Sequence, residues 1–120
     1  MATMTQPLQQ LAEEARQRVT EVSPADACER IRNGAIVLDV RDREEFEQGH
    51  IEGAVNISRG TLEMRIMDAI PDLDAPIVCH CAAGKRGALA ADTLQRIGYR
   101  NVVNLAGGLQ GYRDQMGEDG

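Results

Sequence analysis

Short apolar runs alternate with segments of helical periodicity along most of the chain. Four apolar runs predict strands, at residues 35–40, 54–57, 76–81 and 101–105. Four segments beside them predict helices, at residues 43–48, 61–70, 88–97 and 109–116. Strands that alternate with helices indicate an α/β fold, in which a mostly parallel sheet is covered on both faces. Because such sheets bind ligands beyond the carboxyl ends of their strands, functional residues are expected directly after a strand.

Two further helices are predicted before the first of these strands. Small and aliphatic residues recur at helical spacing near the start of the chain: Leu8, Leu11, Ala12, Ala15 and Val19. This spacing predicts a lead-in helix within residues 1–19. The second helix has Ser23 as its predicted N-cap and Pro24 in its first turn, and the Asn33-Gly34 pair ends it.

The composition fits one globular domain. The 120 residues are 42% hydrophobic and 27% charged, and we assign residues 20–116 to one folded domain and residues 117–120 to a disordered tail. Acidic residues outnumber basic ones by 19 to 13, so the formal charge is −6, which argues against nucleic acid or an anionic membrane as a partner. With no Trp, one Phe and two Tyr, the chain lacks aromatic platforms for single-stranded nucleic acid.

The sequence predicts a soluble cytoplasmic protein. It has no apolar stretch of the roughly 20 residues that a membrane span needs, and the first residues lack the pattern of a signal peptide. The three cysteines, Cys28, Cys79 and Cys81, form an odd set that suits a reducing compartment better than a disulfide framework. Cys28 falls within a predicted helix, where we expect a small core residue. We expect a monomer or a weak homodimer.

Reactive side chains gather where the predicted strand 76–81 ends. Cys81 closes this strand and is followed by the loop 82–87 and then by a run of strong helix formers. Backbone N–H groups of such a loop, together with the positive end of the helix dipole, stabilise an anion and favour a thiolate. Lys85, the only lysine of the chain, and Arg86 add two full positive charges. Cys81 is therefore a candidate nucleophile, whereas Lys85 and Arg86 taken alone could equally be a solvated turn.

The length of this loop helps to separate two chemistries. Cysteine phosphatases place five residues between the nucleophile and the loop arginine, whereas four residues separate Cys81 from Arg86. A smaller loop suits a sulfur atom attached to the thiolate better than a tetrahedral phosphate.

At this point the sequence resembles the rhodanese-type single-domain sulfurtransferases. Four stretches carry the resemblance: Leu38 to Arg41 with Glu44 to Phe46; Gly49 to Ala54 with Asn56-Ile57; Cys81 to Arg86; and Gly98-Tyr99 through Asn101-Val102 to Gly108. The resemblance implies a three-layer sandwich with a five-stranded, mostly parallel sheet flanked by helices. It extends from about Thr20 to Gln115, which would make residues 20–116 a rhodanese-like domain.

The resemblance also implies an activity. A thiosulfate sulfurtransferase would move a sulfane sulfur from thiosulfate or a similar small anionic donor, through a Cys81 persulfide, to a thiol acceptor or to cyanide. The substrate would be bound by the loop residues Ala82, Ala83, Gly84, Lys85, Arg86 and Gly87. Among these, Arg86 and Lys85 would hold the donor's sulfonate oxygens, and the backbone N–H groups would stabilise the persulfide. The acceptor would be a small thiol or a redox protein, and neither a metal nor an organic cofactor is required.

Two departures from the family pattern keep other functions open. The family commonly has Ser where this chain has Gly87, a position from which Ser could cap the helix and donate to the loop sulfur, and commonly Trp where it has Tyr112. A non-catalytic sulfur carrier or docking module is therefore one alternative. A phosphatase or an arsenate reductase on the same fold is another.

Several polar residues near this loop are expected to be structural. If the strand continues to Cys81, alternation turns His80 away from both Cys79 and Cys81. It places Cys79 on the same side as Cys81, where Cys79 could resolve the persulfide or simply pack. Asp39 and Arg41 are predicted to form an ion pair, and His50 to be a hydrogen-bonding residue of a turn. A further group of acidic residues predicts a solvated helix face: Asp42, Glu44, Glu45 and Glu47.

Overall fold

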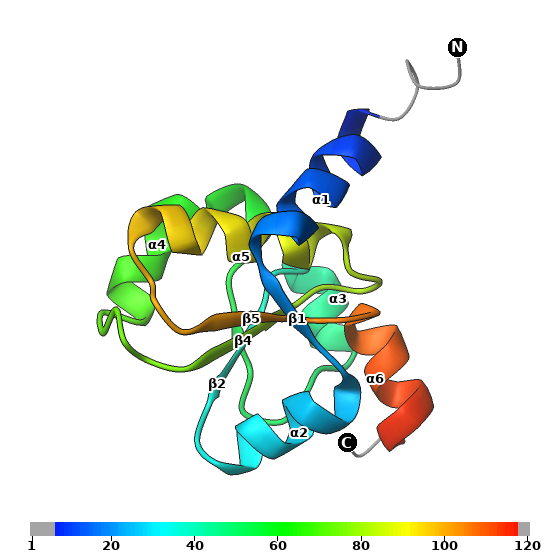
Figure 1. Cartoon of the computed structure of the whole chain (residues 1–120). Helices are drawn as coiled ribbons and strands as arrows, with labels where there is room; N and C mark the ends of the chain where they lie inside the picture. The colour runs from blue at the N-terminus through cyan, green and yellow to red at the C-terminus, as the bar shows by residue number, and fades with distance from the viewer. Residues whose placement is uncertain (1–6, 118–120) are drawn as a thin grey trace.

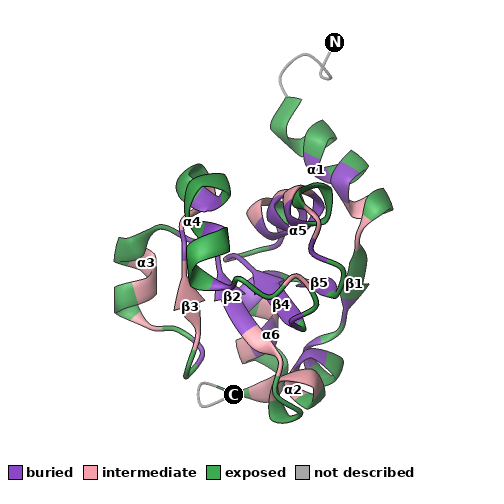
Figure 2. Cartoon of the chain, turned by 90° about the vertical axis from the view of Figure 1, so that its left-hand side faces the viewer, coloured by how far each residue is buried: buried purple, intermediate pink, exposed green. Residues whose placement is uncertain are grey.

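The sheet has five strands, all parallel, and the computed structural model describes residues 7–117. The strands are β1 (Thr20–Val22), β2 (Ile36–Asp39), β3 (Val55–Asn56), β4 (Ile77–His80) and β5 (Val102–Leu105), in the spatial order β1-β5-β4-β2-β3 (Figures 1 and 2). The hydrophobic pattern predicted four of them. It missed β1 because this strand has three residues, of which only one is buried.

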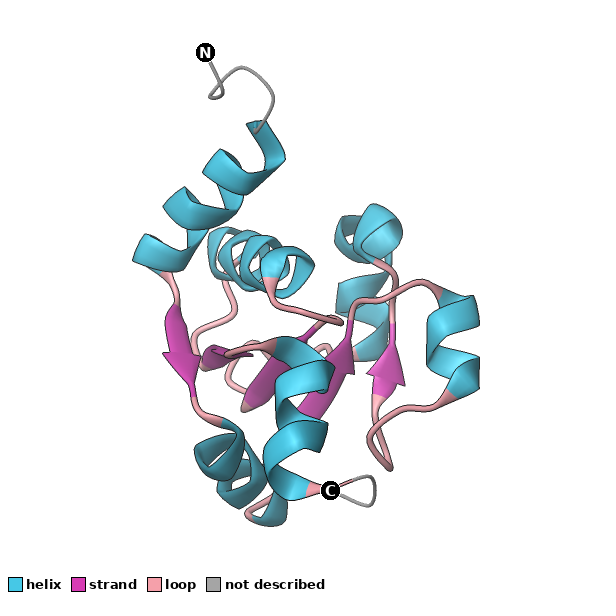
Figure 3. Ribbon diagram, turned by 90° about the vertical axis from the view of Figure 1, so that its right-hand side faces the viewer, coloured by secondary structure: helices cyan, strands magenta, loops and turns pink. Residues whose placement is uncertain are grey.

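Helices cover both faces of the sheet and complete the three-layer sandwich that the resemblance implied (Figures 1 and 3). One face carries α1 (Pro7–Arg18), α4 (Leu62–Ala69) and α5 (Lys85–Ile97), and the other carries α2 (Pro24–Arg32) and α6 (Gly108–Met116). The short helix α3 (Arg43–Gln48) lies beside β3, and a 3-10 turn, η2 (Arg59–Thr61), precedes α4 (Figure 2). No helix within residues 7–117 is long and apolar enough to cross a membrane.

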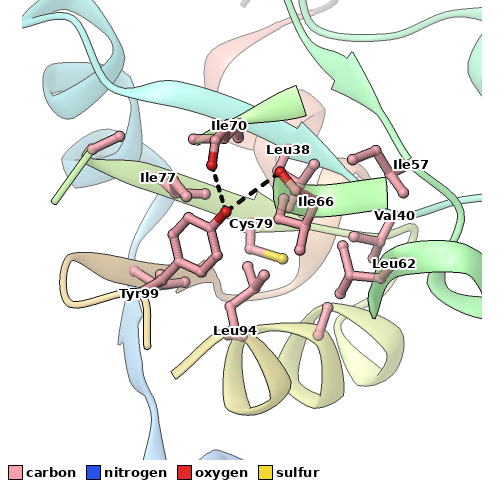
Figure 4. Close-up of a cluster of buried hydrophobic side chains, with 14 of the residues drawn as sticks. Leu38, Val40, Ile57, Leu62, Ile66, Ile70, Ile77, Cys79, Leu94 and Tyr99 are labelled. Carbon is pink, nitrogen blue, oxygen red and sulfur yellow. Dashed lines mark hydrogen bonds between the residues drawn. The ribbon is translucent and has the colours of Figure 1, made fainter. Parts of the chain in front are cut away.

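Two aliphatic clusters hold the three layers together. The larger one lies between the sheet and the helices α4 and α5, where Leu38, Ile66, Cys79 and Leu94 are completely buried (Figure 4). The hydroxyl of Tyr99 closes this cluster by donating to the carbonyl oxygens at the end of α4. Each fully buried aliphatic side chain stabilises the fold by roughly 1.5–3 kcal/mol. Because Ile77 and Cys79 of β4 belong to this cluster, the packing holds β4 in place.

The second cluster lies between the sheet and the helices α2 and α6. Helix α2 begins where the sequence predicted. Ser23 Oγ accepts a hydrogen bond from the Asp26 N–H at 3.1 Å, and Pro24 occupies the first turn. Cys28 packs against this cluster, as predicted for a small core residue, although it is only half-buried.

Helix α5 begins three residues before the predicted start at residue 88. Its N-cap is Gly84, with φ +127°, and Lys85 and Arg86 form the first turn. The sequence pattern missed this turn because Lys85 is exposed and Arg86 half-buried, so neither contributes an apolar position. Gly87 therefore lies within the helix, and a Ser at that position could not be its N-cap.

The lead-in helix α1 packs on α5. Ala12 and Ala15 are completely buried, Arg18 forms a two-point ion pair with Asp92 at 3.1 and 2.7 Å, and the carbonyl oxygen of Arg18 accepts from the Gln95 side chain at 3.2 Å. The predictions for residues 1–6 and for the tail residues 118–120 lie outside the described residues.

Candidate active site at the end of strand β4

Cys81 is the first residue after β4, at the carboxyl end of the sheet. It is 2% exposed, and its Sγ accepts a hydrogen bond from the backbone N–H of Gly84 at 3.0 Å. Gly84 is also the N-cap of α5, so the sulfur lies at the positive end of a 13-residue helix. A backbone donor and a helix N-terminus both stabilise negative charge on this sulfur.

The carbonyl groups of the loop are held from the opposite side by α6. The Cys81 oxygen accepts from the Leu109 N–H at 2.8 Å, and the Ala82 oxygen accepts from the Gln110 N–H at 3.0 Å. A β-carbon on Gly108 would come within 2.6 Å of both oxygens, so only glycine permits this approach. Because a trans peptide points its N–H away from its C=O, fixing these carbonyls fixes the direction of the N–H groups that follow.

His80 supports the same carbonyl and does not act on the sulfur. Its Nδ1–H donates to the Cys81 oxygen at 3.0 Å, and its Nε2 lies 3.6 Å from Asp39 Oδ2 without a hydrogen bond. Burial lowers the pKa of His80, although Asp39 opposes this shift, so the ring is neutral near pH 7. This contact agrees with the structural role predicted for His80.

A buried ion pair supports the strand ends beneath the loop. Arg41 donates to both Asp39 oxygens, at 3.0 and 2.8 Å, and to the Gly49 carbonyl at 2.8 Å. Asp39 is 0% exposed and Arg41 6%. The predicted ion pair is present, and it also ties the turn after α3 to β2. His50 agrees with its prediction too, because its Nδ1 bonds the Phe46 carbonyl at 2.7 Å.

The loop arginine has a partner that the sequence did not suggest. Arg86 forms a two-point ion pair with Glu45, at 2.9 and 3.2 Å, and both side chains are half-buried. The prediction of a solvated face is therefore wrong for Glu45, which also accepts from the Asp42 N–H at 3.0 Å at the start of α3. A separation of 41 residues hid this pair from any local pattern. Glu45 holds the Arg86 guanidinium at the rim of the loop.

The remaining loop residues differ in their exposure. Ala83 and Lys85 are exposed, whereas Ala82 is half-buried and borders a pocket of about 410 Å³. This pocket opens between the loop and α6, and its lining residues are Arg41, Ala82, Leu109, Gln110, Arg113 and Asp114. Arg41 in this lining is already paired with Asp39, whereas Arg113 and Asp114 place charges of opposite sign beside the loop.

Cys79 is a core residue. It is completely buried, and its Sγ–H donates to the Gly87 carbonyl at 3.7 Å. Burial raises the pKa of this thiol, so Cys79 stays protonated and is a poor nucleophile. Figure 4 shows Cys79 among the side chains of the larger cluster. Cys81 belongs to the same cluster, as strand alternation predicted.

Comparison with known proteins decides the family. Residues 23–115 match the family model described as Rhodanese-like domain. The chain belongs to the rhodanese-like family. A thiosulfate sulfurtransferase, GlpE of Ectopseudomonas mendocina, is 38% identical over 92 residues, which are 77% of this chain and 83% of that protein. The thiosulfate sulfurtransferase PspE of Escherichia coli is 38% identical over 73 residues, which cover 61% and 69% of the two chains.

Solved structures agree on the rhodanese-like fold. A Rhodopseudomonas palustris protein of unknown function, described as a possible tyrosine phosphatase, superposes with a TM-score of 0.83 at 31% identity. That match covers 92% of this chain and 91% of the other. An Escherichia coli rhodanese solved with anions gives a TM-score of 0.61 at 36% identity, covering 65% and 91% of the two chains.

Gly87 makes room for a side chain of β5 in this rhodanese-like domain. A β-carbon at position 87 would clash with Oδ1 of Asn104, which is buried and has no hydrogen-bond donor within residues 7–117. We predict that Gly87→Ala destabilises the protein by about 1–3 kcal/mol through overpacking. Urea denaturation checks this, and the cost should shrink in an Asn104→Ala background. An unchanged midpoint for the single variant would rule out the clash.

The Glu45–Arg86 pair makes stability depend on pH. The hydrogen bonds from Arg86 lower the pKa of Glu45 from its ordinary value of 4.5 to about 2. A lowered pKa in the folded state stabilises the protein fully above about pH 4.5, and this contribution is lost as pH falls towards 2. The stability gap between wild type and Glu45→Gln should therefore be widest near pH 7 and shrink in acid. Denaturation curves at several pH values test this, with Glu44→Gln on the exposed side of α3 as the control. A gap that does not vary with pH would contradict it.

Proposed function

We propose that this protein is a thiosulfate sulfurtransferase that carries a sulfane sulfur as a persulfide on Cys81. The observation that carries the proposal is the Gly84 N–H on the Cys81 sulfur, at the N-terminus of α5. This arrangement stabilises the two anions of the reaction, the thiolate and the persulfide. The names of GlpE and PspE support the same activity.

The reaction takes place in two displacements. The Cys81 thiolate attacks the outer sulfur of thiosulfate, the S–S bond of the donor breaks, and sulfite leaves with the electron pair. A thiolate acceptor, or cyanide in an assay, then attacks the outer sulfur of the persulfide. The S–S bond of the persulfide breaks, the outer sulfur stays on the acceptor, and the Cys81 thiolate leaves with the electron pair. No external oxidant or reductant is needed, because the sulfur is transferred without a net change of electrons.

The charges around the loop favour a small anionic donor. Lys85 is exposed at the start of α5 and is available to bind sulfonate oxygens. Arg86 lies beside it but is shared with Glu45, so it adds positive charge while Glu45 fixes its position. Because Cys81 is almost fully buried, only a small terminal atom of the donor can reach its sulfur. The terminal sulfur of thiosulfate meets this requirement. We propose a small thiol or a redox protein in a reducing compartment as the acceptor.

A phosphatase is the second candidate, because the Rhodopseudomonas palustris structure is described as a possible tyrosine phosphatase. A substrate panel separates the two. The purified protein is given thiosulfate with cyanide, p-nitrophenyl phosphate, or arsenate with a thiol. Sulfur transfer predicts repeated formation of thiocyanate and no release of nitrophenol. Nitrophenol release without thiocyanate would replace the proposal by a phosphatase, and one loaded sulfur without turnover would replace it by a sulfur carrier.

A further inference from the structure

Side chains that precede the family match reach the Cys81 loop. The match begins at residue 23, whereas Arg16 lies on α1 and Glu21 on β1. Nη2 of Arg16 is 3.1 Å from the point that a β-carbon on Gly84 would occupy. Gly84 is the residue whose N–H donates to the Cys81 sulfur. A guanidinium from the lead-in helix thus occupies the space beside the sulfur-binding residue of the loop.

These side chains form a continuous chain of contacts behind the loop. Nε of Arg16 lies 3.5 Å from Glu21 Oε2, and the same carboxylate oxygen accepts from Asn104 Nδ2 at 2.8 Å. Asn104 in turn packs against Gly87. The chain of contacts therefore touches both Gly84 and Gly87, the two glycines that flank Lys85 and Arg86.

The charge of Arg16 is directed at the loop. Its Nη1 and Nε face Glu13 and Glu21, whereas its Nη2 forms no hydrogen bond or ion pair with any other described residue. The side chain is 31% exposed, so solvent screens it only in part. Without Arg16, the carboxylate of Glu21 would remain behind the loop with no cation beside it.

Several other charges surround the Cys81 sulfur. They come from every element packed against the loop: Lys85 and Arg86 on α5, Glu45 and Asp42 at α3, Asp39 and His80 on the strands below, Arg59 on η2, and Arg113 and Asp114 on α6. Arg86 is paired with Glu45, and Asp39 with Arg41. Lys85 forms no ion pair with another residue in the range 7–117, and Arg16, although it faces Glu13 and Glu21, turns its Nη2 towards Gly84.

We propose that Arg16 is a positioning residue that favours the anionic forms of Cys81. It does so by placing positive charge at Gly84 and by neutralising Glu21. The lead-in helix is then a working part of the active site. This inference deepens the proposed function, because a thiolate is the nucleophile of the sulfur-transfer reaction.

The test measures the reactivity of Cys81 without sulfur transfer. Iodoacetamide alkylation is followed from pH 5 to pH 10 by the mass of the peptide that contains Cys81. In Arg16→Gln the rate at pH 7 should fall about threefold to tenfold, and the pH of half-maximal rate should rise. Arg16→Lys should keep most of the rate. Glu21→Gln, which retains the acceptor for Asn104, should react at least as fast as wild type, and Arg16→Gln/Glu21→Gln should recover towards wild type.

A control on the same helix separates charge from packing. Arg18→Gln removes the ion pair with Asp92, which holds α1 on α5 away from the loop, and should leave the alkylation profile unchanged. The inference is overturned if Arg18→Gln slows alkylation as much as Arg16→Gln, or if Glu21→Gln slows it too, because loosening of the helix would then explain the effect. The predicted alkylation pattern in a protein that forms no thiocyanate would instead overturn the sulfurtransferase proposal alone.

Discussion

Replacing Cys81 with Ser is expected to lower thiocyanate formation from thiosulfate and cyanide by about three orders of magnitude or more. A serine hydroxyl is not ionised near neutral pH and cannot hold the transferred sulfur as a persulfide. The change removes little volume and keeps an acceptor for the Gly84 N–H, so the fold should persist. The measurement is initial-rate turnover, together with circular dichroism of the variant.

Cys79→Ala is the matched control for this loss. Cys79 is two residues away and completely buried, and it bonds the Gly87 carbonyl. Its removal should reduce stability by about 1–2 kcal/mol and leave turnover within a few-fold of wild type. Turnover that survives in Cys81→Ser, or that is lost equally in both variants, would exclude Cys81 as the sole sulfur carrier.

Asp39→Asn is expected to destabilise the protein by about 3–5 kcal/mol, because it leaves the Arg41 guanidinium buried without a counter-ion. Both side chains are almost fully buried, and Arg41 also holds the Gly49 carbonyl. Unfolding should therefore shift to much lower urea concentration. If the loss leaves too little folded protein, Arg41→Lys gives a second measurement, with a smaller loss from the missing two-point geometry.

Asp74→Asn provides the exposed counterpart. Asp74 forms an ion pair of the same two-point geometry with Arg100, at 2.7 and 3.0 Å, but both side chains are about two-thirds exposed. Its loss should shift the urea midpoint far less than the loss of Asp39 does, because solvent screens an exposed pair. Equal losses for Asp39→Asn and Asp74→Asn would show that burial does not set the strength of the inner pair.

Local patterns were sufficient to predict the centre of the sheet and to place the candidate nucleophile at a strand end. The runs that became β2 and β4 are apolar on both faces, which is typical of strands buried in a parallel sheet. Cys81 was placed correctly at a strand end because strand, loop and helix follow one another directly in the sequence. The order of elements along the chain was therefore enough to locate this end of β4.

Contacts between distant segments could not be predicted in this way. Glu45 was expected in solvent, yet it binds Arg86. The lead-in helix had no predicted partner, yet it packs on α5 and places Arg16 beside Gly84. The packing of Asn104 against Gly87 likewise produces no periodic pattern in the sequence. Each depends on how helices and strands are arranged around the loop, which hydrophobic periodicity does not specify.

The most direct test of the proposed function is the mass of the intact protein after incubation with thiosulfate. Wild type and Cys79→Ala should each gain the mass of one sulfur atom, Cys81→Ala should gain none, and cyanide should remove the gain with release of thiocyanate. A sulfur adduct that persists in Cys81→Ala, or no adduct in wild type with thiosulfate or other sulfane donors, would contradict a persulfide on Cys81.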